Sequence, residues 1–290
     1  MITIVIPVYN GGKKLCRALD SALDQIDGML AKVVVINNAS TDETKAVLDS
    51  YNNSNLFIFN YEDNVDMWAN HNRAFDHIED GHCLFLHGDD YLEQNAISNL
   101  IKSIESDSDA NNTIYWGYSR FADFSNILIQ NGFLVNVGFA GERAFIPFTK
   151  QGLTPSGTCY PVKRLQRKAL FYTNGTTRFA SDSISMIRWA CYGFRFKMLD
   201  YSIVVRTGAT TGAPVDGVAR NKYFDALNDV FFGSDLINQK RMAQIGLTCK
   251  SSDRKITWFS QYCLSKKLIR KNTYYKQLGL FWLKRFFGSK

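Results

Sequence analysis

Four short apolar segments, each ending in a polar loop, constrain what this chain can fold into. They are Ile2–Ile6, Val33–Ile36, Leu56–Phe59 and Cys83–Leu86, and helical spacing of apolar residues occurs between them. Continuous apolar segments of this kind are typical of parallel strands that are buried on both faces. The alternation predicts an α/β fold with a mainly parallel sheet flanked by helices. Because ligands bind at the carboxyl edge of such sheets, the polar loops are the expected binding region.

The loop sequences follow the order of a known enzyme family. They read TIVIPVYNGG and VVVINNASTDET around the first two strands, then Glu62-Asp63-Asn64, His71-Asn72, FLHGDD from Phe85, and Phe179-Ala180-Ser181-Asp182. Over about residues 1–210 the chain resembles the family 2 glycosyltransferases, inverting enzymes of the GT-A fold. The resemblance implies transfer of a sugar from a nucleotide-diphosphate sugar to an acceptor hydroxyl, in a single displacement.

The resemblance places the nucleotide over the first two loops. It implies that Pro7, Val8, Tyr9 and Asn10 lie beside the nucleoside, and that Asn38 stands where the family often carries an Asp facing the uracil ring. An Asn amide can accept from a pyrimidine N3–H and donate to O4, so base pairing survives while the identity of the base stays open. The alternative for the first loop is an ordinary strand-to-helix turn.

A third polar segment is expected along the nucleotide and its diphosphate. Asn64 and Asn72 match the family pattern there, whereas His71 stands where Arg is common. The resemblance implies that Asn64 and Asn72 belong to the nucleotide-sugar site. The alternative is that His71, Asn72 and Arg73 form the solvated polar face of a helix between Trp68 and Ile78.

Two adjacent acids follow the fourth strand. Asp89 and Asp90 stand at its expected carboxyl edge, with His87 before them. Hard divalent cations prefer oxygen ligands from carboxylates and phosphates, so these acids predict a Mn²⁺ or Mg²⁺ site that neutralises a leaving diphosphate. The family pattern DxDD implies contact of Asp89 with the nucleotide sugar as well. His87 replaces the first acid of that pattern and would ligate Mn²⁺ or only hydrogen-bond; the alternative for the acids is turn capping.

The resemblance assigns the catalytic base to Asp182. Attack opposite the leaving diphosphate requires a carboxylate that takes the proton of the acceptor hydroxyl as the new bond forms. Ser181 replaces the Glu that usually precedes this Asp, and Thr207 stands where relatives often carry a His that reaches the metal. The metal shell is therefore atypical. The alternative for Asp182 is a first-turn acid favoured by the helix dipole.

The region that faces the acceptor in the family is the most variable. Ile127–Ile129 and Phe133–Val135 predict a hairpin around Asn131-Gly132. The small residues of Thr154–Thr158 would let a sugar approach the backbone closely. An ordinary turn is the alternative there.

The resemblance fades after residue 215, which predicts a catalytic domain over 1–215 and a helical extension over 216–290. From Arg254 to Lys290 there are ten Lys or Arg and no Asp or Glu. Of the 34 basic residues, 24 therefore lie in residues 1–253 with all 27 acidic ones, which gives that part of the chain a net charge of about −3. A basic amphipathic helix over Tyr274–Phe287 carries Trp and Phe, which favours peripheral contact with an anionic membrane. The alternative is packing on the catalytic domain or on a partner.

Composition bounds the compartment and the partners. Six cysteines without a CxxC pair, most of them in apolar segments, indicate buried free thiols in a reducing compartment and hence a cytoplasmic location. The basic helix near the C-terminus adds the expectation of peripheral contact at the inner membrane face. No apolar run reaches the roughly 18 residues of a membrane span. Four histidines lie close together in the sequence. A structural zinc site is not indicated, because no paired Cys accompanies them. No nucleic-acid motif accompanies the basic tail, and no feature sets the oligomeric state.

The expected acceptor is a glycan or a lipid-linked sugar, as in assembly of a surface polysaccharide or glycolipid.

Two other functions compete with glycosyl transfer. A non-catalytic relative that binds a nucleotide sugar or glycan would explain the substitutions at His87, Ser181 and Thr207. A sugar nucleotidylyltransferase would need a Gly-rich phosphate loop, for which Gly11-Gly12-Lys13 is a poor substitute. A dinucleotide-dependent dehydrogenase is disfavoured because GxGxxG is absent after the first strand.

Overall fold

The fold was analysed in a computed structural model of the 290-residue chain. The residues that it describes are 1–121, 127–128, 132–136, 143–147, 155–168, 170–171, 173, 185, 189, 192 and 194–207. The predicted base Asp182 and the predicted extension over residues 216–290 lie outside these residues.

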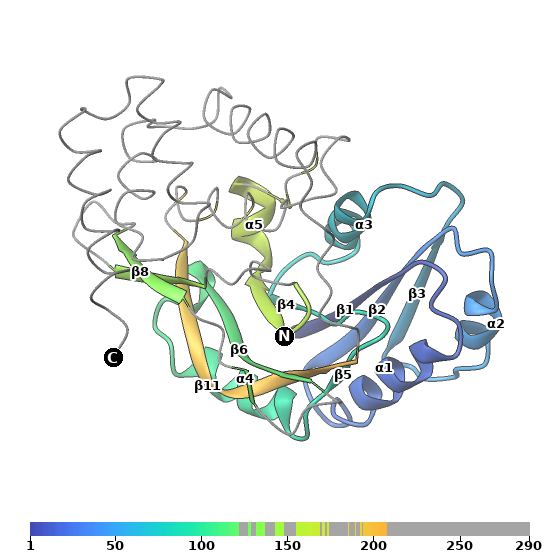
Figure 1. Ribbon diagram of the computed structural model, residues 1–290, viewed down its shortest axis with the longest axis horizontal. Coiled ribbons are helices and arrows are strands. Elements are labelled where there is room, and N and C mark those ends of the chain that lie inside the picture. The colour runs from blue at the N-terminus through green and yellow to red at the C-terminus, as the bar shows by residue number, and fades with distance from the viewer. Residues whose placement is uncertain are drawn as a thin grey trace, which may run out of the picture.

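A mixed sheet forms the centre of the described structure (Figure 1). Its strand order is β3-β2-β1-β4-β10-β6-β11-β5, and β7 pairs with β6 beside this path. The bounds are β1 Ile2–Val8, β2 Ala31–Asn38, β3 Leu56–Tyr61, β4 His82–Phe85, β5 Tyr91–Leu92, β6 Thr113–Phe121, β7 Ile127–Leu128, β10 Thr158–Pro161 and β11 Arg195–Arg206. The four strands predicted from the apolar segments are β1 to β4, so the predicted α/β fold is confirmed.

The parallel part of the sheet is its N-terminal half. β1 pairs in parallel with β2 on one side and β4 on the other, and β2 pairs in parallel with β3. β10 then enters antiparallel between β4 and β6, while β11 runs parallel to β6 and antiparallel to β5. The sheet is therefore parallel where the first loops gather and mixed beyond β4.

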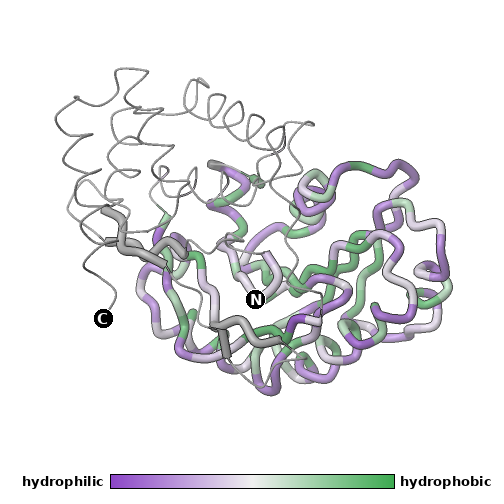
Figure 2. Tube along the Cα trace, viewed as in Figure 1, coloured by the Kyte–Doolittle hydropathy of each residue, from purple (hydrophilic) through white to green (hydrophobic). Residues whose placement is uncertain are grey.

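Helices cover both faces of the sheet. Strand side chains alternate between faces, so β1 sends Ile4 and Ile6 to one side and Val5 to the other, and all three are buried. The Ile4 side packs with residues of α1 and α4, and the Val5 side packs with residues of α3 and α5. The helices are α1 Lys14–Leu23, α2 Thr44–Asp49, α3 Met67–Arg73, α4 Ala96–Glu105 and α5 Val162–Lys168, with short 3₁₀ turns η1 Ala74–Asp76 and η2 Ala110–Asn112. Figure 2 shows hydrophobic residues concentrated along the central strands and hydrophilic ones in the outer loops.

The predicted hairpin around Asn131-Gly132 is wrong. β7 pairs with β6, whereas β8 (Gly132–Asn136) pairs antiparallel with β9 (Arg143–Pro147) in a separate small sheet. Both halves of the expected hairpin are strands, but each has a different partner. Turn chemistry alone suggested the pairing, and more distant segments supply it instead.

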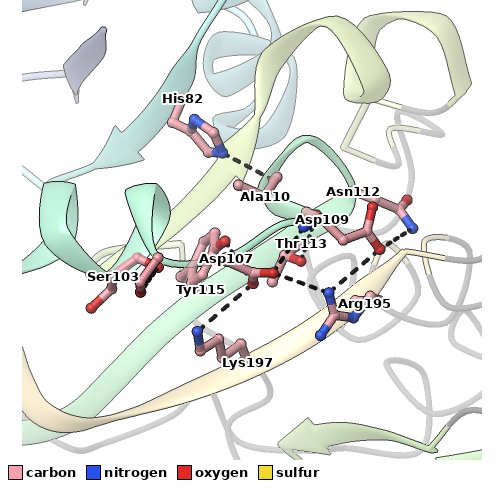
Figure 3. Close-up of polar contacts among 11 residues, drawn as sticks. His82, Ser103, Asp107, Asp109, Ala110, Asn112, Thr113, Tyr115, Arg195 and Lys197 are labelled. Carbon is pink, nitrogen blue, oxygen red and sulfur yellow. Dashed lines mark hydrogen bonds and ion pairs between the residues drawn. The ribbon is translucent and has the colours of Figure 1, made fainter.

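A polar network ties β11 to the segment before β6, at the end of the sheet away from the first loops (Figure 3). Asp107 is the centre of this network. Its side chain accepts from the Tyr115 hydroxyl at 2.9 Å and from Arg195 Nη1 at 3.1 Å, and Lys197 Nζ lies at 3.8 Å. Arg195 also reaches Asp109 at 3.4 Å. Burial raises the pKa of the Asp107 carboxyl, but the hydrogen bond from the Asp109 N–H at 3.0 Å, together with Tyr115 and the two cations, outweighs burial and lowers that pKa overall.

Candidate functional site

The turn that follows β4 gathers three candidate metal ligands at the carboxyl edge of the parallel strands. The Leu86 N–H still donates to Val5 O at 2.9 Å, and the Asp90 N–H donates to His87 O at 3.0 Å, which closes the turn. The ligand atoms of His87, Asp89 and Asp90 all lie within 4.8 Å of one another. The structure therefore brings together the three residues that the sequence nominated for a cation.

Asp90 is the anchored member of this cluster. Only 5% of the residue is exposed, and its two carboxylate oxygens accept from different segments: Oδ2 from Ser156 Oγ at 2.6 Å and Oδ1 from the Thr207 N–H at 3.1 Å. Burial raises the pKa of the Asp90 carboxyl, while His87 and the Ser156 hydrogen bond counteract part of that rise. The orientation of Asp90 is thus fixed by groups far away in the sequence.

Ser156 and Thr207 have site roles that sequence reasoning missed. Besides donating to Asp90, Ser156 Oγ accepts from the His87 N–H at 3.2 Å, and the Thr207 hydroxyl donates to the main-chain oxygen of Asp89. The segments after β9 and after β11 therefore brace the turn from two sides. The sequence analysis placed Ser156 in a segment that a sugar could approach and Thr207 where relatives often carry a His that reaches the metal, but neither position shows a pattern that predicts a contact with Asp90.

His87 contacts a second histidine on the neighbouring helix. His71 Nε2 lies 3.3 Å from His87 Nε2, and His71 Nδ1 lies 2.6 Å from Met67 O. Only 2% of His71 is exposed. Burial, reinforced by the charge of His87, lowers the pKa of His71 to about 3. Burial also lowers the pKa of His87, against the pull of Asp90 and Asp89. In the family pattern, Arg is common at the position of His71, and Asp stands at the position of His87. The two residues that differ from the pattern are therefore in contact with each other.

The donor set fits a divalent cation. Two carboxylates and one imidazole can converge on a common point within the 4.8 Å cluster, and Asp89 is exposed, so an ion can reach the cluster from solvent. Carboxylates suit Mg²⁺ and Mn²⁺, and an imidazole nitrogen suits transition metals. Arg206 adds a positive charge nearby: burial lowers the pKa of its guanidinium, and the charges of Asp90 and Asp89 counteract part of that effect.

The loops after β1 and β2 are bonded into one rim. Asn10 adopts a left-handed conformation with φ 53°, and its Oδ1 accepts from the Thr41 N–H at 2.8 Å. The Asn10 N–H donates to Ser40 Oγ at 3.0 Å. Pro7 and Val8 are buried at the end of β1, whereas Tyr9 is 52% exposed. Of the first predicted group, Tyr9 and Asn10 are therefore the residues open to a ligand.

Asn38 is less open than its predicted role requires. Only 3% of the residue is exposed. Its Oδ1 accepts from the Val65 N–H at 3.0 Å and from Arg73 Nη1 at 2.8 Å, and its Nδ2 donates to Val65 O at 2.8 Å. Asn64 Oδ1 lies 3.5 Å from the same nitrogen. The Asn38 amide thus pairs with the main chain of Val65, and pairing with a pyrimidine would require release of that segment.

Asn72 also bonds to the protein with both ends of its amide. Nδ2 donates to Phe171 O at 2.9 Å, and Oδ1 accepts from the Phe171 N–H at 2.9 Å. Phe171 is buried against Phe85, Tyr160 and Trp189. The contacts make Asn72 a clamp between α3 and the core, and its contact with the diphosphate stays a prediction.

Comparison with known proteins identifies the family. A sequence profile described as Glycosyl transferase family 2 matches residues 3–188. The chain belongs to glycosyl transferase family 2. The match spans β1 to α5 and the site turn after β4, so the resemblance drawn from the loop sequences is confirmed.

Curated relatives of this family 2 chain match it over part of their length. Glycosyltransferase GlyA of Streptococcus pneumoniae serotype 4 is 27% identical over 104 residues, which are 36% of this chain and 15% of the relative. An uncharacterized glycosyltransferase of Rickettsia prowazekii, RP339, is 28% identical over 128 residues, 44% of this chain and 39% of the relative. Chondroitin synthase of Escherichia coli is 24% identical over 185 residues, 63% of this chain and 25% of the relative. The matched region is thus a minor part of each relative.

Solved structures share the fold. The crystal structure of S. aureus TarS 1-349 in complex with UDP-GlcNAc aligns with a TM-score of 0.66 at 16% identity, covering 97% of this chain and 80% of that one. GalNAc-T7 with UDP, GalNAc and Mn²⁺ aligns with a TM-score of 0.59 at 14% identity, covering 79% and 47%. At these identities the likeness establishes the GT-A fold. Within the described residues, no helix has the length and apolarity needed to cross a membrane.

Proposed function

We propose that this family 2 chain transfers a sugar from a nucleotide-diphosphate sugar to an acceptor hydroxyl with inversion at the anomeric carbon. The observation that carries the proposal is the His87, Asp89 and Asp90 cluster at the carboxyl edge of β4. It lies on the strand that pairs with β1, whose own carboxyl edge leads into the loop rim carrying Tyr9. A cation ligand set suits the diphosphate of such a donor, and the exposed aromatic ring of Tyr9 suits its nucleoside.

The cation would be held by His87, Asp89 and Asp90. When bound, Mn²⁺ or Mg²⁺ supplies positive charge that stabilises the departing diphosphate. The chain's own residues prepare the position: Ser156 and Thr207 aim the two oxygens of Asp90. Arg206 places a further cation close to these acids.

The proposed nucleoside site is the rim after β1 and β2. Tyr9 offers an exposed ring to a base, and Asn10 orders the loop that presents it. Pro7, Val8, Asn38 and Asn64 remain proposed members of the site, Asn38 on the condition that Val65 gives up its hydrogen bonds. Because TarS and GalNAc-T7 are solved with UDP ligands, we favour a uridine nucleotide.

The proposed base is Asp182, in the segment that resembles the family's acidic motif. A carboxylate on the acceptor side would take the hydroxyl proton while the diphosphate leaves from the opposite side. We further propose that residues 1–215 form the catalytic domain and that the basic helical extension over 216–290 brings it to the inner face of the cell membrane. The acceptor would then be a lipid-linked sugar or a growing surface glycan, and the match to chondroitin synthase supports a glycan acceptor.

A donor panel in the presence of Mn²⁺, read by release of nucleoside diphosphate, tests this function. Asp89→Ala should abolish donor binding, whereas Asp182→Asn should keep donor binding and lose transfer. Asp49→Ala is a matched control, because Asp49 is an exposed acid that pairs only with Lys45 on α2 among the described contacts. Transfer by Asp182→Asn at the wild-type rate would refute the base assignment. Donor binding without turnover on any acceptor would favour the non-catalytic alternative.

A further inference from the structure

We propose that His71 is a positioning residue that fixes His87 with its Nδ1 toward the cation, and that this nitrogen ligand makes the site select Mn²⁺ over Mg²⁺. The inference rests on the cation site of the proposed function. It concerns the contact between His71 and His87, and His71 is not itself a member of the ligand cluster.

The proton on His71 can be located from its hydrogen bond to α3. His71 Nδ1 lies 2.6 Å from Met67 O, and a carbonyl oxygen can only accept, so Nδ1 carries the hydrogen. The ring is enclosed by aromatic groups, with centroid distances of 5.0 Å to Phe85, 5.5 Å to Trp68 and 5.6 Å to Phe171. Such an apolar enclosure disfavours a charged ring, so His71 is neutral and its Nε2 has only a lone pair.

The tautomer of His87 follows from that of His71. Their Nε2 atoms are 3.3 Å apart, and two lone pairs at that distance would repel, so one nitrogen must donate. Since His71 Nε2 carries no hydrogen, His87 Nε2 donates. A neutral His87 then has its free lone pair on Nδ1, so Nδ1 is the nitrogen that would serve as the ligand atom of His87 in the cluster with Asp89 and Asp90.

This chain of bonds from the Met67 carbonyl through His71 to His87 resembles the outer-shell support that metal-binding histidines need. A histidine that ligates a metal through one nitrogen usually donates its other N–H to a fixed acceptor, which sets the tautomer and the ring orientation. Here the acceptor is another histidine instead of a carboxylate or carbonyl. His71 is itself held by the first turn of α3, which Asp66 caps by accepting from the Trp68 and Ala69 N–H groups.

The nitrogen ligand decides the expected metal. Mg²⁺ prefers oxygen ligands in near-octahedral geometry, whereas an imidazole nitrogen suits transition metals, and among these Mn²⁺ also suits carboxylates. In this chain an imidazole occupies one of three ligand positions. The wild-type site should therefore bind Mn²⁺ more tightly than Mg²⁺, and His87→Asp, with three carboxylates, should reverse or abolish that preference.

Two measurements on the full-length chain test the inference. The first is ¹⁵N NMR of the histidine rings in the metal-free wild type, which reports the tautomers directly. The second is titration with Mn²⁺ alone, followed by electron paramagnetic resonance, and competition with Mg²⁺, for the wild type, His71→Phe and His87→Asp. The matched control is His82→Phe, because His82 is equally buried but bonds to Ala110 O at the opposite end of β4.

The expected NMR result is an Nδ1–H tautomer for His71 and an Nε2–H tautomer for His87. His71→Phe should weaken Mn²⁺ binding by about 10- to 100-fold with a smaller effect on Mg²⁺, and His82→Phe should change neither. An Nδ1–H tautomer for His87, or unchanged Mn²⁺ affinity in a folded His71→Phe variant, would overturn the inference while leaving the cation site intact. A wild-type chain that binds neither ion would refute the cation site of the proposed function and this inference with it.

Discussion

Replacement of Asn72 by Ala separates a structural role from a ligand role at one predicted site residue. The variant removes two hydrogen bonds of 2.9 Å between the Asn72 amide and the main chain of Phe171. Each bond contributes about 1 kcal/mol, and leaving a buried main-chain group unpaired costs about 1–3 kcal/mol. Because Phe171 is buried, we expect the free energy of unfolding to fall by about 2–4 kcal/mol.

Urea unfolding followed by circular dichroism measures this loss, and calorimetry with UDP measures ligand affinity in the same preparations. The control is Asn52→Ala, in an exposed segment, which should change the stability by less than about 0.5 kcal/mol. A structural clamp predicts lower stability with nearly unchanged UDP affinity for the folded fraction. An unchanged unfolding free energy together with a large loss of UDP affinity would refute the clamp and support direct contact with the diphosphate.

Three further predictions concern stability away from the site. Asp107→Ala should lower the unfolding free energy by about 2–3 kcal/mol in urea, because it removes the acceptor of several donors including the half-exposed Arg195, and an unchanged urea midpoint would contradict this. Gly117→Ala should destabilise by more than about 2 kcal/mol or prevent folding, since the added methyl would clash with the main-chain oxygen of Tyr201; a wild-type melting curve would argue against that packing. Burial lowers the pKa of His82 in the folded chain, so below about pH 6.5 the imidazole is protonated in the unfolded chain before it is protonated in the folded one. The free energy of unfolding should therefore fall as the pH falls, by up to about 1.4 kcal/mol per pH unit. Urea midpoints at pH 7.5 and 5.5 should differ less in His82→Asn than in the wild type, and equal differences would count against it.

The sequence predicted the elements whose signal is local. Runs of β-branched and apolar residues identified β1 and β2, because their short length and the polar loops that follow them favour a strand buried on both faces over a buried helix. The position of β10 between β4 and β6 could not be predicted in this way. β10 is the short segment Thr158–Pro161, and its place is set by tertiary pairing with Leu84 and Tyr115 rather than by its own pattern.

Some residues of the candidate site could likewise be predicted from the sequence, and others could not. His87, Asp89 and Asp90 are close in sequence, so the turn that joins them could be recognised from the motif alone. Ser156 and Thr207, which hold Asp90, come from distant segments and have no local signature. The contact between His71 and His87 likewise depends on α3 packing against the end of β4. Sequence reasoning noted both histidines as departures from a pattern, but only their geometry relates one to the other.

The most direct test of the central claim, that the turn after β4 holds a cation for a nucleoside diphosphate, is calorimetric titration of UDP into the full-length chain with Mn²⁺ and with a chelator. The account predicts UDP binding that depends on Mn²⁺ and is lost in Asp89→Ala but retained in the control Asp49→Ala. UDP binding of equal strength in the presence of the chelator, or unaffected by Asp89→Ala, would contradict it.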